Sequence, residues 1–482
     1  MRNIERLITI ALALASIGVW IAAGPSHLWI RMFAVVPAAL IILHLRVEGR
    51  HWQMFPAYIA SLVLLLSLIP VWNGWNPNRT ALVSAGLTLA TVVFSWALPM
   101  FKLPQPSGQY PVGTRTIYLI DATRDEMHAG APAGKRELVA QLWYPSATSE
   151  GPKAPYRQRE ETTLLSSYQA ILETNSIDSP GVHAGHFPVL VFNHAWTGFR
   201  NRNTFVAQEM ASHGFVVVAV SHTYNSSIVA LPGGRIAHSQ QLDIGFYADT
   251  LIPVEERHAI ADDELRVQID DCHFVLDTLK QFDETPGHFL EGHLDMESIG
   301  AYGYSYGGAV SVELAIEDPR VRCALELDGV LHGQAALEGL NKPLMMIDSL
   351  AMTRTSEMPK DLDPIDRAKF ELFQTTIRAK AATLVRYGGY QVCIDGVSHE
   401  NFSDGSFMSP LRLLTKAGRL APRRSAQIIG AYMVAFFQYT LLNQTSALLA
   451  PEVKPFPEAT LVLYPPEVAV AGSELAGSSR QS

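Results

Sequence analysis

Cysteine is scarce in this chain of 482 residues, which contains only Cys272, Cys323 and Cys393. Their odd number and wide spacing indicate neither a disulfide framework nor a C-x-x-C metal motif, so we expect buried hydrophobic side chains. The sixteen histidines include no H-E-x-x-H pair, which argues against a metal-dependent hydrolase. We therefore expect an activity that needs neither a metal ion nor an organic cofactor.

Positive charge is also in short supply, because 37 lysine and arginine residues stand against 46 aspartate and glutamate residues. The formal net charge of −9 argues against a nucleic-acid partner. Internal repeats are not evident, and the first hundred residues are far more apolar than the remainder. The chain is long enough for a large α/β domain in addition to this apolar part.

The apolar part has the character of a membrane region. It contains four stretches, at residues 7–23, 28–45, 56–72 and 81–100. Each is about long enough to cross a hydrocarbon layer of about 30 Å, so we predict four transmembrane helices within residues 1–102. The second stretch is the weakest, because Arg31 and His44 lie near its ends and Pro37 lies within it. Three spans and one interfacial helix are the alternative, and a cleaved signal peptide would explain only the first stretch.

The predicted orientation of this multi-pass region follows from basic residues in its short loops. One side of the membrane receives Arg2, Arg6, Arg46, Arg50 and Lys102, and the other side receives Arg31 and Arg79. This asymmetry favours a cytoplasmic N-terminus, and four spans return the rest of the chain to the cytoplasm. With three spans the rest of the chain would lie on the opposite side.

Beyond the apolar region the sequence has the pattern of an α/β domain. Residues 103–114 are rich in Pro and Gly and predict a linker, residues 115–450 predict the globular domain, and residues 451–482 predict a Pro-, Ser- and Gly-rich tail. We expect little order after Gly472. Strands are predicted at 137–144, 188–193, 215–220, 324–327, 344–347 and 383–385, and helices at 262–283 and 427–442. Their alternation predicts a mostly parallel sheet covered by helices.

The most informative motif is G-x-S-x-G at residues 303–307, where Ser305 stands between an apolar run and a segment rich in small residues. In an α/β-hydrolase the nucleophile sits on a strained turn between a strand and a helix, and the glycines remove Cβ atoms that would clash. Residues 299–302 can end such a strand, and residues 307–314 can begin the helix. Ser305 is therefore the candidate nucleophile.

A serine nucleophile needs a base, and only two histidines, His332 and His399, follow Ser305 in the sequence. The histidine of an α/β-hydrolase comes last of the three catalytic residues, on a late loop that folds back over the serine. His399 fits this order better, because it lies in a turn-rich stretch after a predicted strand. His332 is more simply explained as an ordinary structural residue.

The acid that orients the histidine has three candidates, Asp328, Asp348 and Asp395. Asp328 and Asp348 both follow apolar runs, so each can emerge from the carboxyl end of a strand, where sites of this fold are built. The sequence pattern by itself does not choose between these two residues.

Seven separated segments form a wider pattern: YPVG at 110–113, LWYP at 142–145, VFNHAWTGFR at 191–200, ASHGF at 211–215, GYSYG at 303–307, RCALELD at 322–328 and SHENF at 398–402. In this order they resemble the platelet-activating factor acetylhydrolase family, the plasma type (isoform II) and its bacterial relatives, within the α/β-hydrolase superfamily. The resemblance implies that the acid follows a strand soon after the serine. It therefore favours Asp328 and implies a triad of Ser305, Asp328 and His399.

The resemblance also implies an oxyanion hole, which needs two backbone N–H groups directed at the developing negative charge. One would belong to Tyr306 and the other to Trp196. The family usually carries H-G-x-G where this chain has His194, Ala195, Trp196 and Thr197. Alanine and threonine adopt a positive φ less readily than glycine, so we expect a loop of different shape. In such a loop Trp196 would shape the acyl pocket or pack in the core.

The implied activity is that of a membrane-anchored serine esterase, which removes short acyl groups from the second position of phospholipids through an acyl-enzyme. Its partner would be a lipid or small ester substrate. Two other interpretations stay open. One is a broad carboxylesterase or polyester hydrolase, since fold does not fix substrate. The other is a membrane scaffold or sensor whose hydrolase domain has lost activity.

Two surface features have alternative interpretations. Residues 350–374 are polar and contain prolines, which indicates either a cap over the pocket or an ordinary surface helix and loop. A basic group late in the domain can contact anionic headgroups or form a solvated face. It consists of Arg412, Lys416, Arg419, Arg423 and Arg424.

Overall fold

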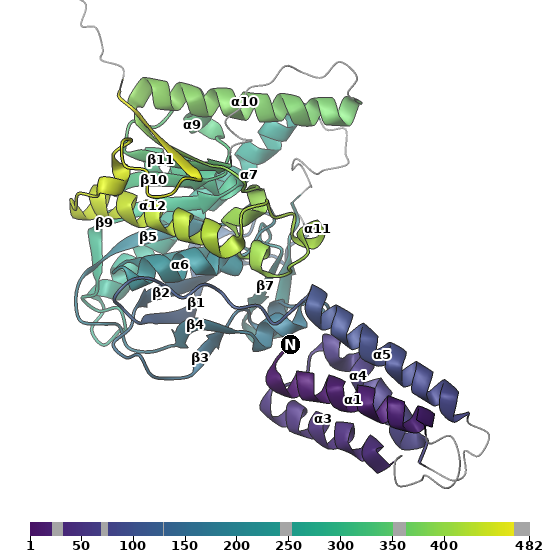
Figure 1. Cartoon of the computed structure of the whole chain (residues 1–482). Helices are drawn as coiled ribbons and strands as arrows, with labels where there is room; N and C mark the ends of the chain where they lie inside the picture. Colours follow the sequence, from purple (N-terminus) through teal and green to yellow (C-terminus); the bar gives the residue numbers. More distant parts are fainter. Residues whose placement is uncertain (22–31, 69–75, 129, 242–252, 350–362, 467–482) are drawn as a thin grey trace, which may run out of the picture.

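The computed structural model describes residues 1–21, 32–68, 76–128, 130–241, 253–349 and 363–466. Within these ranges the chain forms a small helical bundle at the N-terminus and a larger α/β part (Figure 1). The bundle and the α/β part meet at one end of the bundle, where the chain leaves its last helix.

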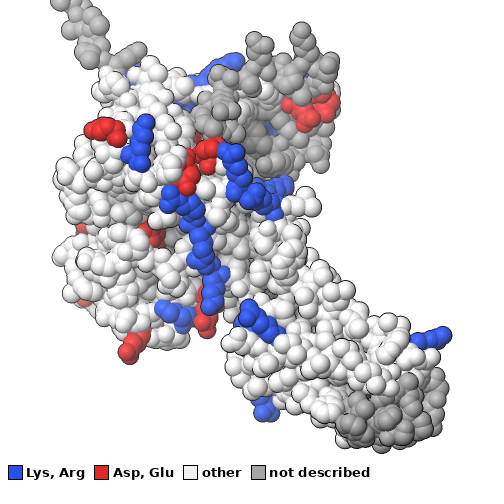
Figure 2. Space-filling model, in the orientation of Figure 1, with Lys and Arg blue, Asp and Glu red and all other residues white. Residues whose placement is uncertain are grey.

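Four apolar helices form the bundle, α1 (Asn3–Ile21), α3 (Val35–Val47), α4 (Phe55–Leu66) and α5 (Pro77–Ala97). They share a small buried core, and many of their outward side chains are also large, apolar and exposed. A helix in water would carry polar residues on that outer face. Figure 2 shows few charged side chains on the visible face of the bundle.

The helices of the bundle differ in whether they are long enough to cross a membrane. Among the described residues, three helices are long and apolar enough to cross a membrane: α1, α5 and α12 (Pro422–Leu442). Of the apolar window in α12, 67% is buried inside the α/β part, so its hydropathy reflects a core position. The helices α3 and α4 have 13 and 12 residues, fewer than the roughly 20 that a span requires. The four predicted spans thus coincide with four apolar helices, of which two have the length of a span.

One large sheet forms the centre of the α/β part, with the strand order β13-β12-β11-β10-β9-β5-β6-β2-β1-β4-β3. From β12 to β6 all neighbouring strands are parallel, which is the mostly parallel sheet that the sequence predicts. The strands are β1 (Val112–Asp125), β2 (Lys135–Pro145), β3 (Lys153–Pro155), β4 (Glu173–Asp178), β5 (Phe187–Asn193), β6 (Val216–Ser221), β9 (Leu294–Tyr304), β10 (Val321–Leu327), β11 (Leu344–Ser349), β12 (Gly389–Ile394) and β13 (Ala459–Tyr464). A separate hairpin pairs β7 (Ile228–Leu231) with β8 (Arg235–His238).

Helices cover both faces of the sheet (Figure 1). On one face lie α6 (Thr204–Ser212) and α12, and on the other lie α7 (Val254–Glu284) and α8 (Tyr306–Glu317). The remaining helices are α9 (Gly333–Glu338), α10 (Pro364–Tyr387) and α11 (Arg412–Thr415). This three-layer arrangement is the α/β architecture in which helices bury the two apolar faces of one sheet.

Each face of the sheet has its own core. Neighbouring residues of a strand point to opposite faces, so Leu190 of β5 belongs to the core under α12 and Val191 belongs to the core under α7. Each core contains one buried cysteine, Cys323 under α12 and Cys272 under α7, in agreement with the prediction. Cys393 is only partly buried.

Most predicted elements lie within observed ones. Residues 137–144 fall in β2, 188–193 in β5, 215–220 largely in β6, 324–327 in β10, 344–347 in β11, 262–283 in α7 and 427–442 in α12. The sheet also reaches past the predicted domain limits of 115 and 450, because β1 begins at Val112 and β13 lies within the predicted tail. The stretch after Gly472 lies outside the described residues.

The predicted strand at 383–385 is wrong, because these residues lie near the end of α10 and the strand β12 follows them. A short apolar run does not distinguish a strand from a buried helix turn. The helix ends where Gly388 adopts a φ of 80°, a left-handed conformation that glycine accepts without strain. Within the predicted cap, residues 364–374 form the first part of α10, and residues 350–362 lie outside the described part.

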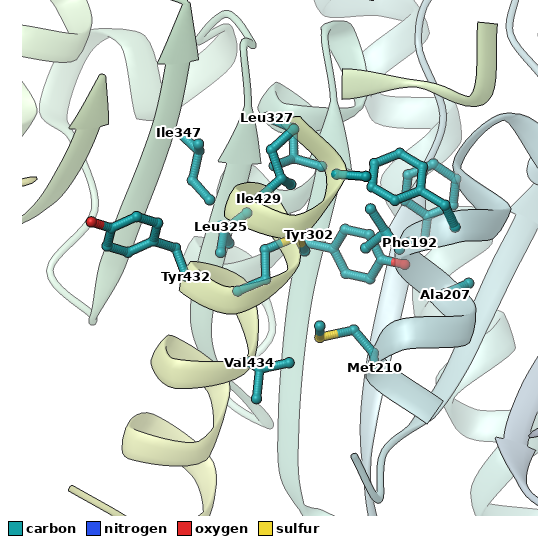
Figure 3. Close-up of a cluster of buried hydrophobic side chains, with 14 of the residues drawn as sticks. Phe192, Ala207, Met210, Tyr302, Leu325, Leu327, Ile347, Ile429, Tyr432 and Val434 are labelled. Atoms are coloured by element: carbon teal, nitrogen blue, oxygen red, sulfur yellow. The ribbon is translucent and has the colours of Figure 1, made fainter. Parts of the chain in front are cut away.

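Replacing Ile429 with alanine is expected to lower the free energy of unfolding by about 2–5 kcal/mol. Ile429 is fully buried on α12 and lies over Leu325 and Leu327 of β10 (Figure 3), so the deletion leaves a cavity between helix and sheet. The exposed Gln427 on the same helix provides the control, and Gln427→Ala is expected to change stability by less than about 0.5 kcal/mol. Urea unfolding of the detergent-solubilised protein measures both, and equal effects would contradict the core position of Ile429.

Candidate active site

Ser305 lies between β9 and α8 on a turn whose backbone segments are in unusually close contact. Its φ of 58° and ψ of −122° fall in a region that residues with a side chain rarely adopt. A Cβ atom on Gly303 would lie 1.8 Å from the carbonyl oxygen of Gly307, and one on Gly307 would lie 2.0 Å from that of Asn193. The Ser305 N–H donates to the carbonyl of Leu327 at 3.0 Å. The two glycines of the motif are therefore required by the space available.

His399 connects Ser305 to Asp328. Its Nε2 lies 3.0 Å from Ser305 Oγ, and its Nδ1 lies 2.8 Å from Asp328 Oδ2. His399 begins the short 3-10 helix η10 (His399–Phe402), and Asp328 follows β10 with a φ of 48°. The Tyr304 ring packs against the imidazole at an interplanar angle of 30°, and its hydroxyl donates to the His399 carbonyl at 3.1 Å. The structure thus places in one hydrogen-bonded series the three side chains that the sequence and the family resemblance point to.

The carboxyl group of Asp328 is only 2% exposed. Burial alone would raise its pKa, but the hydrogen bond and charge of His399, together with the Ser349 N–H at 2.7 Å, hold the pKa below its ordinary value. The carboxylate therefore stays ionised at neutral pH and accepts a hydrogen bond from the Nδ1–H group of His399. This leaves Nε2 as the acceptor that faces the Ser305 hydroxyl.

The other sequence candidates have different partners. His332 lies with its Nδ1 3.5 Å from Asp262 Oδ1, and Asp395 is exposed and pairs with Arg419. Asp348 is fully buried at the end of β11, one strand away from Asp328. Among the described residues, these three candidates make no hydrogen bond to the Ser305 or His399 side chain.

A buried ion network beneath the Asp328 turn has no signature in the sequence. The ammonium of Lys380 on α10 pairs with the carboxylates of Glu326 and Asp348 and donates to the Gly329 carbonyl at 3.3 Å. The Gly329 N–H in turn donates to Glu326. Burial raises the pKa of Glu326, and the charge of Asp348 adds to this against the opposing effect of Lys380. Lys380 thereby holds two carboxylates and the turn that carries Asp328.

The loop after β5 contains the second predicted oxyanion residue. The Trp196 indole packs edge-on against the Tyr306 ring, with centroids 4.8 Å apart, so the loop lies against the first residue of α8. Thr197 adopts a φ of 51°, and Ala195 does not adopt a positive φ. The Gly198 N–H donates to the Ala195 carbonyl at 2.7 Å and closes the turn. The loop therefore makes its turn with a strained threonine, and the oxyanion roles of the Tyr306 and Trp196 N–H groups stay predictions.

A neutral histidine supports this loop from below. His194 Nδ1 lies 2.8 Å from the Ala195 carbonyl, and its Nε2 lies 2.7 Å from Ser226 Oγ. Burial, with a smaller contribution from the positive form of His222, lowers the pKa of His194 to about 3. The ring is therefore uncharged, its Nδ1–H donates to the carbonyl, and its Nε2 accepts from the serine. The loop keeps this support throughout the neutral pH range.

One group of side chains in the described part of the chain is spaced closely enough to hold a metal ion, namely Glu5, His44 and Glu48. It lies in the bundle and is separate from Ser305. Arg2 already contributes a positive charge there, with its Nε 2.7 Å from Glu5 and 3.7 Å from Glu48.

A nucleophile-bearing turn between strand and helix, on a mostly parallel sheet and in series with a histidine and a buried carboxylate, defines a serine hydrolase of the α/β-hydrolase class. A family model described as platelet-activating factor acetylhydrolase, isoform II, matches residues 97–447. The chain belongs to this family, in agreement with the resemblance found in the sequence.

Individual relatives support the same assignment. The chain is 24% identical to the platelet-activating factor acetylhydrolase of Bos taurus over 73% of this chain and 81% of that protein. It is 22% identical to a probable 1-alkyl-2-acetylglycerophosphocholine esterase of Arthroderma benhamiae over 78% of this chain and 97% of that protein. A ferulic acid esterase from Streptomyces cinnamoneus superposes with a TM-score of 0.59 at 28% identity, over 75% of this chain and 99% of that structure. The protein is a serine-type ester hydrolase.

Replacing Thr197 with glycine is expected to raise the free energy of unfolding by about 1 kcal/mol, because a left-handed φ costs a residue with a Cβ roughly 1–2 kcal/mol. Ala195→Gly is the matched control in the same loop. Ala195 has no positive φ, so glycine there only increases the entropy of the unfolded chain and is expected to cost about 0.5–1 kcal/mol. Thermal unfolding of both variants measures these changes in stability. Changes of the same sign in the two variants would contradict backbone strain at Thr197.

Lys380→Met is expected to lower the free energy of unfolding by about 3–5 kcal/mol, because it leaves two buried carboxylates without a counter-charge. The exposed Arg378 on the same helix provides the control, since Arg378→Met removes a cation that solvent already screens. Unfolding is compared at pH 5 and pH 8. The loss in Lys380→Met should be smaller at pH 5, because the raised pKa of Glu326 lets the abandoned carboxylates take up protons. A loss independent of pH would contradict the network.

Proposed function

We propose that this protein is a membrane-anchored serine esterase that hydrolyses short acyl groups at the second position of phospholipids. The observation that carries the proposal is the hydrogen-bonded series from Ser305 Oγ through His399 to Asp328, with distances of 3.0 and 2.8 Å. Family membership supports the substrate class, because relatives are named for hydrolysis of platelet-activating factor and of 1-alkyl-2-acetylglycerophosphocholine.

In this proposal Ser305 Oγ attacks the ester carbonyl while His399 Nε2 accepts its proton. Asp328 stabilises the imidazolium that forms, which its low pKa allows. The N–H groups of Tyr306 and Trp196 stabilise the negative oxygen of the tetrahedral intermediate. His399 then protonates the leaving alcohol, and later it activates a water molecule that releases the acid and restores the serine.

The bundle supports the membrane part of the proposal. We take residues 1–102 as a multi-pass anchor joined by residues 103–114 to the catalytic domain at 115–450, with a short tail after it. The apolar outer faces of α1 and α5 suit contact with lipid. Among the contacts that tie the bundle to the catalytic domain, Trp52 Nε1 donates to the Leu165 carbonyl at 2.8 Å, and Ser409 Oγ donates to the Ala97 carbonyl at 2.5 Å.

The junction also bears on access to substrate. Ser409 lies only a few residues beyond η10, which His399 begins, and it contacts the end of α5. The histidine loop is therefore connected to the bundle, and the active site would lie near the membrane surface. Of the basic group noted in the sequence, Arg424 pairs with Glu458 and Arg419 with Asp395, which suits a solvated face for those two residues. A cytoplasmic location stays the sequence-based proposal.

A broader carboxylesterase is the second candidate. The observation that favours it is the likeness to the ferulic acid esterase, which is named for an ester that is not a phospholipid. The same triad would serve both substrates, so the distinction depends on the acyl and leaving-group pockets. The non-catalytic scaffold that the sequence left open is no longer a candidate, because the protein belongs to a family of ester hydrolases.

Ser305→Ala is expected to reduce hydrolysis of second-position acetyl phospholipid by about 10⁴-fold or more, because it removes the nucleophile. The measurement is release of acetate and longer acids by the full-length protein in detergent, with p-nitrophenyl esters as comparison substrates. Ser149→Ala, at an exposed serine, is the control and should keep full activity.

The chain-length series separates the two candidates. A preference for short acyl groups on phospholipid, lost in Ser305→Ala, supports the proposed function. Turnover by the wild type that is confined to simple esters supports the broad carboxylesterase. Activity that survives in Ser305→Ala would contradict both.

A further inference from the structure

Asp404 is a fully buried carboxyl group a few residues after His399. It begins the 3-10 helix η11 (Asp404–Phe407), one residue after η10 ends, and residues 399–407 together are the histidine loop. A buried carboxylate is costly unless hydrogen bonds or an opposite charge compensate for the lost water. The mechanism proposed above leaves Asp404 without a role, so its role has to be found among its partners.

Backbone and side-chain donors from two distant segments converge on Asp404. Its Oδ2 accepts from the Thr204 N–H at 2.8 Å and from the Tyr156 hydroxyl at 3.0 Å, and its Oδ1 accepts from the Phe205 N–H at 3.1 Å. Thr204 and Phe205 are the first residues of α6, whose N-terminal N–H groups have no acceptor within the helix. Tyr156 directly follows β3. The carboxylate therefore caps α6 from a separate loop and joins that helix to the segment after β3.

The charge of Asp404 strengthens this cap. Burial raises the pKa of Asp404 to about 7, against the opposing effect of its hydrogen bonds and of the Arg202 charge. The carboxyl group is therefore largely ionised at pH 8.5. A charged acceptor forms stronger hydrogen bonds than a neutral one, and the positive end of the α6 dipole adds to the attraction.

Further contacts join the histidine loop to the same part of the chain. Arg202 Nη2 donates to Glu400 at 2.7 Å, and the Asn203 side-chain amide donates to the Phe402 carbonyl at 2.6 Å. Both donors belong to η7 (Arg200–Asn203), a 3-10 helix that connects the loop after β5 to α6. The histidine loop is thereby held along its length against the segment that continues the loop after β5.

The position of the imidazole depends on this attachment. The His399 side chain is 31% exposed, so core packing does not enclose it on all sides. Its backbone carbonyl is fixed by the Tyr304 hydroxyl, and the residues that follow it are fixed by η7 and α6. A displacement of about 1 Å in a catalytic group can cost about 10²-fold in rate, so the support of this loop matters for catalysis.

We propose that Asp404 is a positioning residue that anchors the histidine loop to the N-terminus of α6 and thereby keeps His399 within hydrogen-bond distance of Ser305. The inference rests on the proposed function, because it concerns the steps in which His399 transfers protons. His399 acts in both acylation and deacylation, so a displaced imidazole slows both steps. A lower kcat with an unchanged KM is therefore the expected signature.

The test measures kcat and KM of the full-length protein in detergent at pH 8.5, with p-nitrophenyl acetate and with a second-position acetyl phospholipid. In Asp404→Ala, which removes the acceptor, kcat is expected to fall about 10- to 100-fold on both substrates, with little change in KM. Asp404→Asn keeps the shape and one acceptor oxygen, so it should lose less. Tyr156→Phe removes a single donor and should lower kcat by about 2- to 10-fold.

Glu313→Gln is the matched control. Glu313 on α8 is 4% exposed and accepts from the N–H groups of Gln334 and Ala335, at 3.0 and 2.8 Å, at the start of α9. It is thus another buried carboxyl group that caps a helix, but it lies outside the histidine loop. Thermal unfolding of each variant accompanies the kinetics. Tm is expected to fall in both Glu313→Gln and Asp404→Asn, and kcat only in Asp404→Asn.

The outcomes separate positioning from a general structural role. An unchanged kcat in Asp404→Asn and Tyr156→Phe overturns the proposal, and so does an equal fall of kcat in Glu313→Gln. A raised KM at constant kcat places the effect in substrate binding and also overturns it. If the wild type hydrolyses p-nitrophenyl acetate but not the phospholipid, the proposed substrate is wrong, while the Asp404 variants still test the anchor on the simple ester.

Discussion

The active site depends on a contact between backbone segments that leaves no space for side chains. Three segments meet around Ser305: its own turn, the end of β5 and the turn after β10. A Cβ atom on Gly307 would lie 2.0 Å from the Asn193 carbonyl, and one on Gly329 would lie 2.8 Å from the Ser305 carbonyl. Each segment therefore fixes the position of the other two. Ser305, the loop after β5 and Asp328 are located by one packing constraint rather than by three independent ones.

Charge balance in a buried environment is the second organising principle. Asp328 stays ionised because His399 and a backbone N–H compensate for the loss of solvent. Beneath it, Lys380 pairs with the carboxyl groups of Glu326 and Asp348 from two neighbouring strands, and this network holds the turn of Asp328.

The bundle and the catalytic domain show why hydropathy is ambiguous without a fold. The helices α1 and α12 both satisfy the length and hydropathy of a membrane span, but 33% of the apolar window is buried in α1 and 67% in α12. The first keeps its apolar surface outward, and the second buries it against the sheet. An apolar sequence predicts that a helix is removed from water. Whether protein or lipid then surrounds the helix depends on the elements packed around it.

Local sequence by itself determined the elements whose signals are local. The glycines around Ser305, the apolar runs of the central strands and the turn-rich segment of His399 have direct backbone consequences, and the fold class followed from them. The choice between Asp328 and Asp348 did not follow from pattern, because both residues end neighbouring strands; the family resemblance favoured Asp328, and only the structure shows that Asp348 faces Lys380. Residues 383–385 were assigned to a strand because a short apolar run has no period of its own. Lys380 was not found at all, since its importance comes from burial beside groups that are distant in sequence, and burial is decided when the whole chain is packed.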